Sequence, residues 1–166
     1  DPVVDEDGLP PLHARGKKVI IIGGGDTGAD CLGTVHRHGA TSVHQFEIMP
    51  RPPETRADST PWPVYPLMFR VSSAHEEGGE RIYSVNTEEF VGSDGRVTGL
   101  RGHEVVMNAG KFEKVDGSDF EMEADLVLLA MGFVGPEREG LLTDLGAEIN
   151  ERGNVARDAN FATSVP

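Results

Sequence analysis

The sequence has only one cysteine, Cys31, in 166 residues. A single thiol excludes an intrachain disulfide, a Cys-x-x-Cys redox pair and a cysteine-ligated metal cluster. No apolar run approaches the roughly 20 residues of a membrane helix, and no basic segment followed by an apolar stretch marks a signal peptide. We therefore expect a cytoplasmic protein without a membrane segment, in which Cys31 is a small buried apolar residue.

Basic residues are also scarce. Lys and Arg number 15 against 28 acidic residues, so the formal net charge is −13. This balance argues against a nucleic-acid partner, which would require clustered positive charge. The hydrophobic fraction of 37% and the charged fraction of 26% are those of an ordinary globular chain with room for one domain. The chain neither starts with Met nor closes on a helix, and we expect it to be an excerpt of a longer protein.

The most informative segment is a glycine-rich turn between an expected strand and an expected helix. The β-branched run 19–22 is typical of a strand that is buried on both faces. After the turn, apolar residues recur at helical spacing until Gly39, which suits a helix C-terminus. The turn residues are Gly23, Gly24, Gly25, Asp26, Thr27 and Gly28.

Each glycine of this Gly-x-Gly-x-x-Gly pattern has a physical role. Gly23 permits the tight turn, Gly25 lets the backbone approach a pyrophosphate, and Gly28 lets helix and strand pack closely. The helix N-terminus adds free N–H groups and the positive end of its dipole. A second strand over 41–49 completes a βαβ unit. We predict a dinucleotide site, and the alternative is a glycine turn selected only for its backbone geometry.

Two signals near the end of the second strand conflict over which nucleotide is bound. Glu47 lies about 20 residues past the last glycine, where an acidic residue hydrogen-bonds a ribose 2′-hydroxyl and favours NAD. Arg51 and Arg56 follow, and an arginine there could hold a 2′-phosphate by a bidentate contact, which favours NADP. The alternative for either arginine is a solvated loop charge.

The rest of the chain divides into segments of different pattern. Residues 50–66 are proline-rich and contain the only tryptophan, Trp62, in a loop that can be neither helix interior nor central strand. Residues 81–115 alternate in short pieces, which predicts a β-meander of about three strands. A second apolar run, 126–131, predicts another buried strand. Its end would place Ala130, Met131 and Gly132 where ligands bind in open α/β sheets.

No acid–base constellation stands out. Ser72, Ser73, His75, Glu76 and Glu77 are adjacent in sequence, and we interpret them as a surface loop rather than a catalytic group. Hydride transfer to a flavin needs little from side chains, because the cofactors carry that chemistry. The pattern therefore fits a nicotinamide domain that passes hydride to a flavin bound elsewhere.

These segments together resemble the glutamate synthase small (beta) subunit. The blocks that carry the resemblance are residues 19–31, 46–53, 61–63, 73–79 and 124–137. The resemblance implies a glutathione-reductase-type NAD(P)-binding domain, with a Rossmann-like parallel sheet and an inserted three-stranded β-meander. It also implies three parts: a linker over 1–16, the NAD(P)H-binding domain over 17–145, and the start of a return segment to an absent FAD domain over 146–166.

The resemblance further implies an NADPH-dependent oxidoreductase. In that family NADPH reduces FAD, and 4Fe-4S clusters carry electrons to the large subunit, which forms glutamate from glutamine and 2-oxoglutarate. This chain resembles only the nicotinamide domain, so its expected partners are the FAD domain of the same polypeptide and the large subunit. The residues expected to contact NADPH are Gly24 to Thr27, Arg51, Arg56 and Ala130 to Gly132.

Several alternatives stay open at this point. NADH could replace NADPH, and a paralogous flavoprotein reductase with another electron acceptor would share the same domain. A non-catalytic nucleotide-sensing module would also use the glycine turn. A methyltransferase uses a glycine-rich first turn too, but the meander and the proline-rich loop argue against it.

Overall fold

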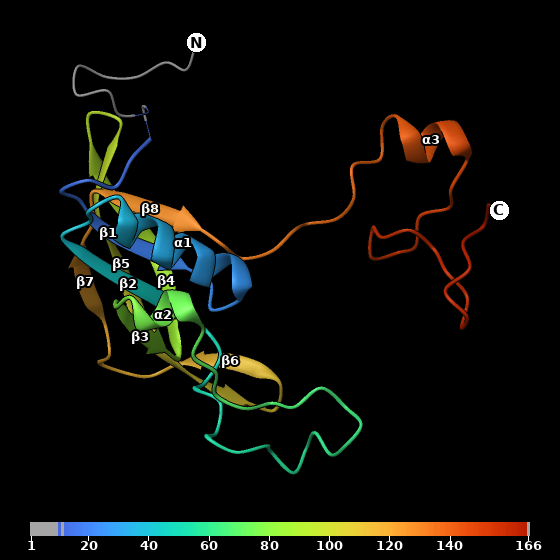
Figure 1. Ribbon diagram of the computed structural model, residues 1–166, viewed down its shortest axis with the longest axis horizontal. Coiled ribbons are helices and arrows are strands. Elements are labelled where there is room, and N and C mark those ends of the chain that lie inside the picture. The colour runs from blue at the N-terminus through green and yellow to red at the C-terminus, as the bar shows by residue number, and fades with distance from the viewer. Residues whose placement is uncertain (1–9, 11, 166) are drawn as a thin grey trace. The chain divides into compact units, whose positions relative to one another are not determined.

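The computed structural model of the chain describes residue 10 and residues 12–165. The described part forms two compact units that divide between Met131 and Gly132. The first unit contains two β-sheets and two helices, and the second contains one short helix (Figure 1). This division falls earlier in the chain than the boundary expected at residue 145. The role of residues 146–166 as a return segment stays a prediction, and most of the expected linker lies outside the described residues.

The first unit is built on a parallel sheet of four strands. In spatial order these are β3 (Glu80–Tyr83), β2 (Ser42–Glu47), β1 (Lys18–Ile22) and β8 (Leu126–Leu129). In β1, Val19, Ile20 and Ile21 are fully buried. Both faces of this strand are covered, which explains why its sequence is continuously apolar rather than alternating. The strands expected at 19–22, 41–49 and 126–131 are present as β1, β2 and β8. The expected burial of the last is wrong, because β8 lies at the edge of the sheet and Leu129 is 60% exposed.

Three short helices complete the regular structure of the described residues: α1 (Asp26–Arg37), α2 (Ser73–Glu76) and α3 (Leu141–Leu145). Helix α1 buries Leu32 and Val35 against β1, and Gly39 follows it with φ +81°. A positive φ favours glycine just past a helix end, as expected. Helix α2 corrects the prediction of an irregular loop at 72–79. In the part of the chain that the structure describes, no helix is long and apolar enough to cross a membrane.

The antiparallel strands are β4 (Val85–Ser93), β5 (Arg96–Asn108), β6 (Lys111–Lys114) and β7 (Phe120–Glu123). β5 pairs with each of the other three. The expected meander over 81–115 is thus present, with two changes: β7 extends it, and residues 81–83 belong to the parallel sheet. Ser84 has φ +57° and breaks the chain between β3 and β4. That break ends the alternation that the sequence had suggested from Tyr83 to Thr87.

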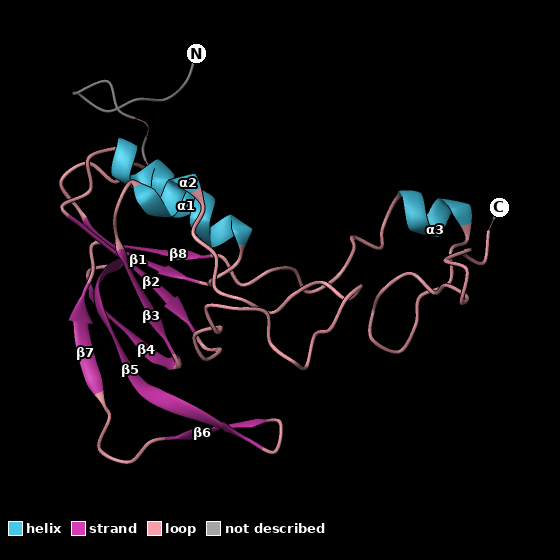
Figure 2. Ribbon diagram, turned by 60° about the horizontal axis from the view of Figure 1, so that its bottom comes forward, coloured by secondary structure: helices cyan, strands magenta, loops and turns pink. Residues whose placement is uncertain are grey.

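The hydrophobic core lies on both faces of the parallel sheet. On one face, Val19 and Ile21 pack with Leu32 of α1. On the other face, Ile20 and Phe46 pack with residues of the antiparallel strands. Figure 2 shows α1 and α2 on one side of the parallel sheet and β4, β5 and β7 on the other. This layered arrangement leaves the carboxyl ends of β1, β2 and β3 free to form a site.

Candidate functional site

The glycine turn connects β1 to α1 at the carboxyl end of the parallel sheet. Gly23 has φ +129°, and a Cβ atom there would overlap the carbonyl oxygen of Ala130. The Gly23 N–H also donates to the Phe46 carbonyl over 2.8 Å. A Cβ atom at Gly28 would overlap the Gly23 carbonyl oxygen. Glycine is therefore required at both positions for α1 to begin so close to the sheet.

Gly25 is different, because a Cβ atom there would meet nothing within 4 Å. It is the N-cap residue of α1, and no side chain caps this end of the helix. Helix N-terminal N–H groups without a partner are suited to bind an anion. Asp26 and Thr27 are exposed in the first turn of α1. The backbone at Gly25 therefore faces open space at the N-terminus of α1.

Glu47 is the last residue of β2, and its side chain is hydrogen-bonded to the glycine turn. Its Oε2 atom accepts a hydrogen bond from the Gly24 N–H over 2.8 Å, and its Oε1 atom accepts one from the Met49 N–H over 2.9 Å. A Cβ atom at Gly24 would overlap this carboxylate, so a larger residue there would have to displace the Glu47 side chain. The predicted contact of Glu47 with a ribose hydroxyl stays a prediction. What the structure adds is a role for the carboxylate in holding the turn.

A cleft of about 620 Å³ opens beside Gly24 and Gly25, between the end of β2 and the proline-rich loop. Arg51 lines it, and its guanidinium carbon lies 4.2 Å from the centre of the Phe69 ring. Arg56 does not line the cleft. Its Nη1 atom donates to the carbonyl oxygens of Thr60 and Val64, over 2.8 and 2.9 Å, and so holds the proline-rich loop together. The structure thus brings Arg51 to the turn and leaves Arg56 in the loop.

Two other arginines line the cleft, and sequence reasoning did not select them. They are Arg70, at the end of the proline-rich loop, and Arg81, on β3. Arg81 lies 4.7 Å from the centre of the Phe69 ring and donates to the Arg70 carbonyl over 2.8 Å. The signal that could have found Arg81 is the short segment 80–83, had it been assigned to the parallel sheet. The cleft thus has three arginines and two acidic residues, Asp26 and Glu47, in its lining, a positive excess in an otherwise acidic chain.

A chain of hydrogen bonds links the turn to α2. Gln45 is 2% exposed, and its Nε2 atom donates to the Gly23 carbonyl over 2.9 Å. The His75 Nε2 atom lies 3.1 Å from the Gln45 Oε1 atom, which can only accept, so His75 donates here. Its Nδ1 atom then accepts from the backbone N–H of Ser72. Burial lowers the pKa of His75, and the charge of Arg81 lowers it further. His75 is a structural member of the cleft wall.

The end of β8 supplies the other predicted residues. Ala130 is buried, and its N–H donates to the Ile22 carbonyl over 2.7 Å. Met131 is 67% exposed. Gly132 begins the second unit and has φ +85°. Ala130 thus lies directly beside the glycine turn, as expected for the ends of adjacent parallel strands.

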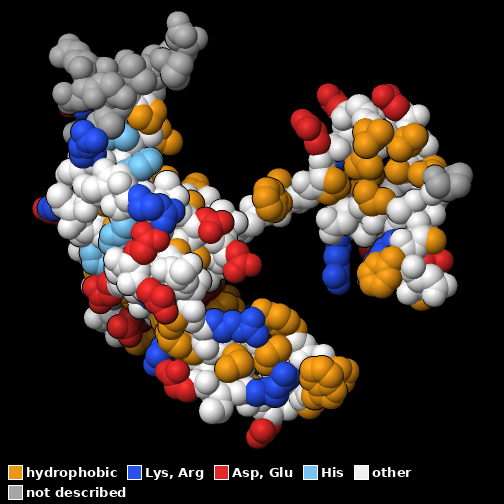
Figure 3. All heavy atoms as spheres, in the orientation of Figure 1, with side chains coloured by type: hydrophobic (Ala, Val, Ile, Leu, Met, Phe, Trp, Pro, Cys, Tyr) orange, Lys and Arg blue, Asp and Glu red, His pale blue; other side chains and the backbone are white. Residues whose placement is uncertain are grey.

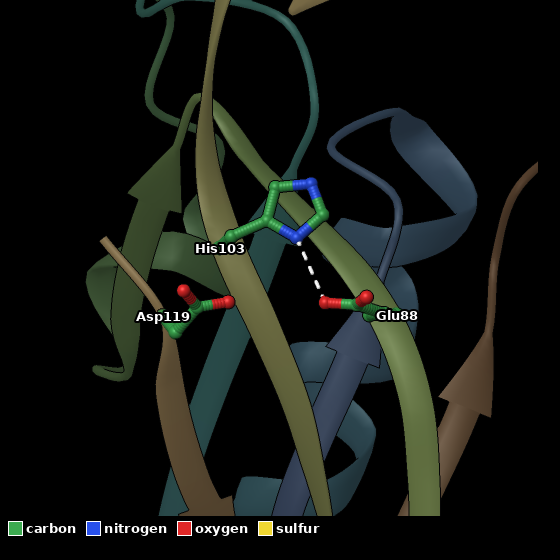
Figure 4. Close-up of side chains that lie close together, drawn as sticks. All are labelled: Glu88, His103 and Asp119. Atoms are coloured by element: carbon green, nitrogen blue, oxygen red, sulfur yellow. Dashed lines mark hydrogen bonds and ion pairs between the residues drawn. The ribbon is translucent and has the colours of Figure 1, made fainter. Parts of the chain in front are cut away.

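Other features of the surface are less suited to a ligand. Glu88 on β4, His103 on β5 and Asp119, just before β7, lie together with their ligand atoms within 4.8 Å of one another (Figure 4). The ammonium group of Lys114 already pairs with both carboxylates, and it lowers the pKa of Asp119 by its hydrogen bond. This cluster is an ion-pair network rather than an open metal site. Cys31 is half-buried against the core, and burial raises the pKa of its thiol.

The proline-rich loop exposes both aromatic and basic side chains. Trp62 and Tyr65 are largely exposed, and the Arg70 guanidinium stacks on the Tyr65 ring. Figure 3 shows hydrophobic and basic side chains side by side over this loop. Within residues 50–66 only the start of the loop, 50–53, lines the cleft, and the exposed aromatic residues Trp62 and Tyr65 do not.

The chain is similar in sequence and in fold to known proteins. No family model matches the chain. The chain is 77% identical over all of its 166 residues to the glutamate synthase (NADPH) small chain of Mycobacterium tuberculosis. The chain is homologous to a segment of the glutamate synthase small chain. It spans 34% of the length of that relative.

One further relative and one solved structure extend the comparison. Glutamate synthase (NADH) of Saccharomyces cerevisiae is 47% identical over 135 residues, covering 74% of this chain and 6% of the yeast protein. Thioredoxin reductase of T. acidophilum superimposes with a TM-score of 0.63 and 25% identity, covering 92% of this chain and 42% of that chain. The expected α/β fold with a parallel sheet and an inserted antiparallel sheet is therefore confirmed. The mycobacterial relative is a glutamate synthase named for NADPH, and the yeast relative is one named for NADH.

Proposed function

We propose that this segment binds NADPH at the glycine turn and presents it to FAD carried by another part of the polypeptide. The observation that carries the proposal is the open space at Gly25, at the uncapped N-terminus of α1 and beside a basic cleft. A dinucleotide needs this combination, because its pyrophosphate binds N–H groups and its adenosine half needs an adjoining groove.

The residues present fit the nucleotide in three places. Gly24 to Gly28 would surround the pyrophosphate, with the Gly24 N–H engaged by Glu47 and the later amides of the turn facing the phosphates. The cleft beyond Glu47 would take the adenosine end. Ala130 to Gly132, at the end of the neighbouring strand, would approach the nicotinamide half. Arg56 is proposed for the nucleotide from its position after the second strand and from the family resemblance, although it does not line the cleft.

Bound NADPH supplies a hydride that FAD accepts. The chain's own contribution is to bind and orient the nucleotide. Its single cysteine cannot supply the thiolate ligands of a 4Fe-4S cluster, so any cluster is held elsewhere. In the whole protein, we propose that electrons pass through such clusters to the large subunit, which forms glutamate from glutamine and 2-oxoglutarate in the cytoplasm.

Substitution of Gly25 tests the phosphate site. Gly25→Val places a branched side chain in the space meant for the pyrophosphate, and Gly25→Ala adds a single methyl group. We expect a graded loss of NADPH affinity by calorimetry, at least tenfold for the valine variant, with melting temperatures close to that of the wild type because the space is open. Unchanged affinity in Gly25→Val would refute the phosphate assignment.

A further inference from the structure

The cleft contains a pair of arginines that the glycine turn does not explain. Arg51 follows β2, and Arg81 lies on β3, which pairs with β2 in parallel register. Both guanidinium groups stack on the same ring, Phe69, at 4.2 and 4.7 Å from its centre. Phe69 packs edge-on against Tyr83. Two segments about 30 residues apart in sequence therefore bring two positive charges to one place.

Neither charge is fully balanced by the protein. Among the described residues, no acidic group forms an ion pair with Arg81. Arg51 pairs only with Glu54, over 2.6 Å, and both side chains are more than half exposed. An exposed pair of this kind is weak and an incoming anion can displace it. The chain as a whole carries a net charge of −13, so this local excess of positive charge is a departure from its surroundings.

The position of the pair along the sheet suggests which anion it meets. In the β2–β3 register Gln45 lies opposite Arg81, and Glu47 lies opposite Tyr83. Arg81 thus shares a face of the sheet with Gln45 and Glu47, whose side chains reach the glycine turn. In a dinucleotide site the adenosine ribose lies at the end of the second strand. A phosphate on that ribose would be within reach of both guanidinium groups.

We propose that Arg81, acting with Arg51, recognises the 2′-phosphate of NADPH and sets the preference of this site for NADPH over NADH. This inference rests on the proposed nucleotide site. The Phe69 ring holds both guanidinium groups in place before the ligand arrives, which lowers the entropy lost on binding. The phosphate dianion accepts hydrogen bonds from two planar donors, a geometry that guanidinium groups suit better than ammonium groups.

The test measures the affinity of the full chain for NADPH and NADH by calorimetry, in the wild type and in Arg81→Gln. Removing one charge-assisted contact weakens binding by roughly 10- to 100-fold. We expect that loss for NADPH and a change of less than about twofold for NADH. Adenosine 2′,5′-bisphosphate, which has the 2′-phosphate but no nicotinamide, should lose affinity to the same extent as NADPH. Arg96→Gln, at the start of β5 and outside the lining of the cleft, controls for the loss of one positive charge.

NADH serves as the internal control for structure, because a loosened Arg70 segment would weaken both nucleotides. Equal losses for NADPH and NADH in Arg81→Gln, or no loss for either, would overturn the inference. So would a loss of NADPH preference in Arg56→Gln with none in Arg81→Gln. Arg81→Lys, which keeps the charge but not the planar donor, should fall between the wild type and Arg81→Gln. If the wild type binds neither nucleotide, the proposed function itself fails.

Discussion

Gln45 is the residue whose replacement most directly tests how the turn is held. Gln45→Leu keeps the size of the buried side chain but removes its hydrogen bonds to the Gly23 carbonyl and to His75. A net hydrogen bond contributes about 1 kcal/mol, and leaving a buried partner unpaired costs about 1–3 kcal/mol. The Gly23 carbonyl is left in the interior, whereas His75 is only half-buried and can turn to water. We therefore expect a loss of roughly 2–4 kcal/mol in the free energy of unfolding.

Urea unfolding of the wild type, Gln45→Leu, His75→Leu and the double variant completes a double-mutant cycle. A shared hydrogen bond predicts a coupling energy of about 0.5–1.5 kcal/mol between the two positions. Because Gln45 also supports the turn, Gln45→Leu should weaken binding of NADPH and NADH equally, unlike Arg81→Gln. A stability loss below about 0.5 kcal/mol, a value typical of unremarkable surface changes, would refute the role assigned to this chain of hydrogen bonds.

Two further predictions concern the same region. Gly23→Ala forces a Cβ atom onto the Ala130 carbonyl, whereas Gly110→Ala, with φ +80° and open space around it, carries only the backbone strain of about 1–2 kcal/mol. In thermal melts Gly23→Ala should therefore lose clearly more stability than Gly110→Ala. Equal losses in the two variants would contradict the overlap. The pKa of His75 is lowered in the folded state by burial and by Arg81, so the unfolded chain binds the proton first and stability falls as pH drops below about 6.5. The change in the urea midpoint between pH 7 and pH 5 should therefore be smaller in His75→Gln than in the wild type. An equal change in both proteins would argue against this role of His75.

The parts of the site that have a local signature could be predicted from the sequence. The β-branched run of β1 and the spacing of Gly23, Gly25 and Gly28 reflect steric needs within a few residues, so strand, turn and helix followed directly. Helix α2 has four residues and too few internal hydrogen bonds to form alone. Its stability depends on the contact of His75 with Gln45, 30 residues away, and no local pattern reveals that contact.

The positions of the arginines also could not be predicted from the local sequence. Arg51 and Arg56 were equivalent by sequence, because both follow β2 in a loop that is rich in proline. The path of that loop turns Arg56 inward to the carbonyl oxygens of Thr60 and Val64. Arg81 had seemed part of the meander, since alternation runs on past Tyr83. Ser84, with its positive φ, separates β3 from the meander. Arg81 therefore belongs to the parallel sheet, where it lines the cleft.

The hydrogen bonds of Glu47 bear on the conflict between this carboxylate and the arginines. A carboxylate at the end of the second strand ordinarily accepts a ribose hydroxyl and repels a 2′-phosphate. Here both carboxylate oxygens accept backbone N–H groups, from Gly24 and Met49, and those dipoles stabilise the charge where it lies. Glu47 thus has both oxygens engaged by the backbone, while Arg51 and Arg81 line the same cleft and Arg51 has only an exposed ion pair with Glu54. An acidic residue at this position is therefore compatible with a preference for NADPH, and the side chain on β3 becomes the position to compare between relatives named for NADPH and for NADH.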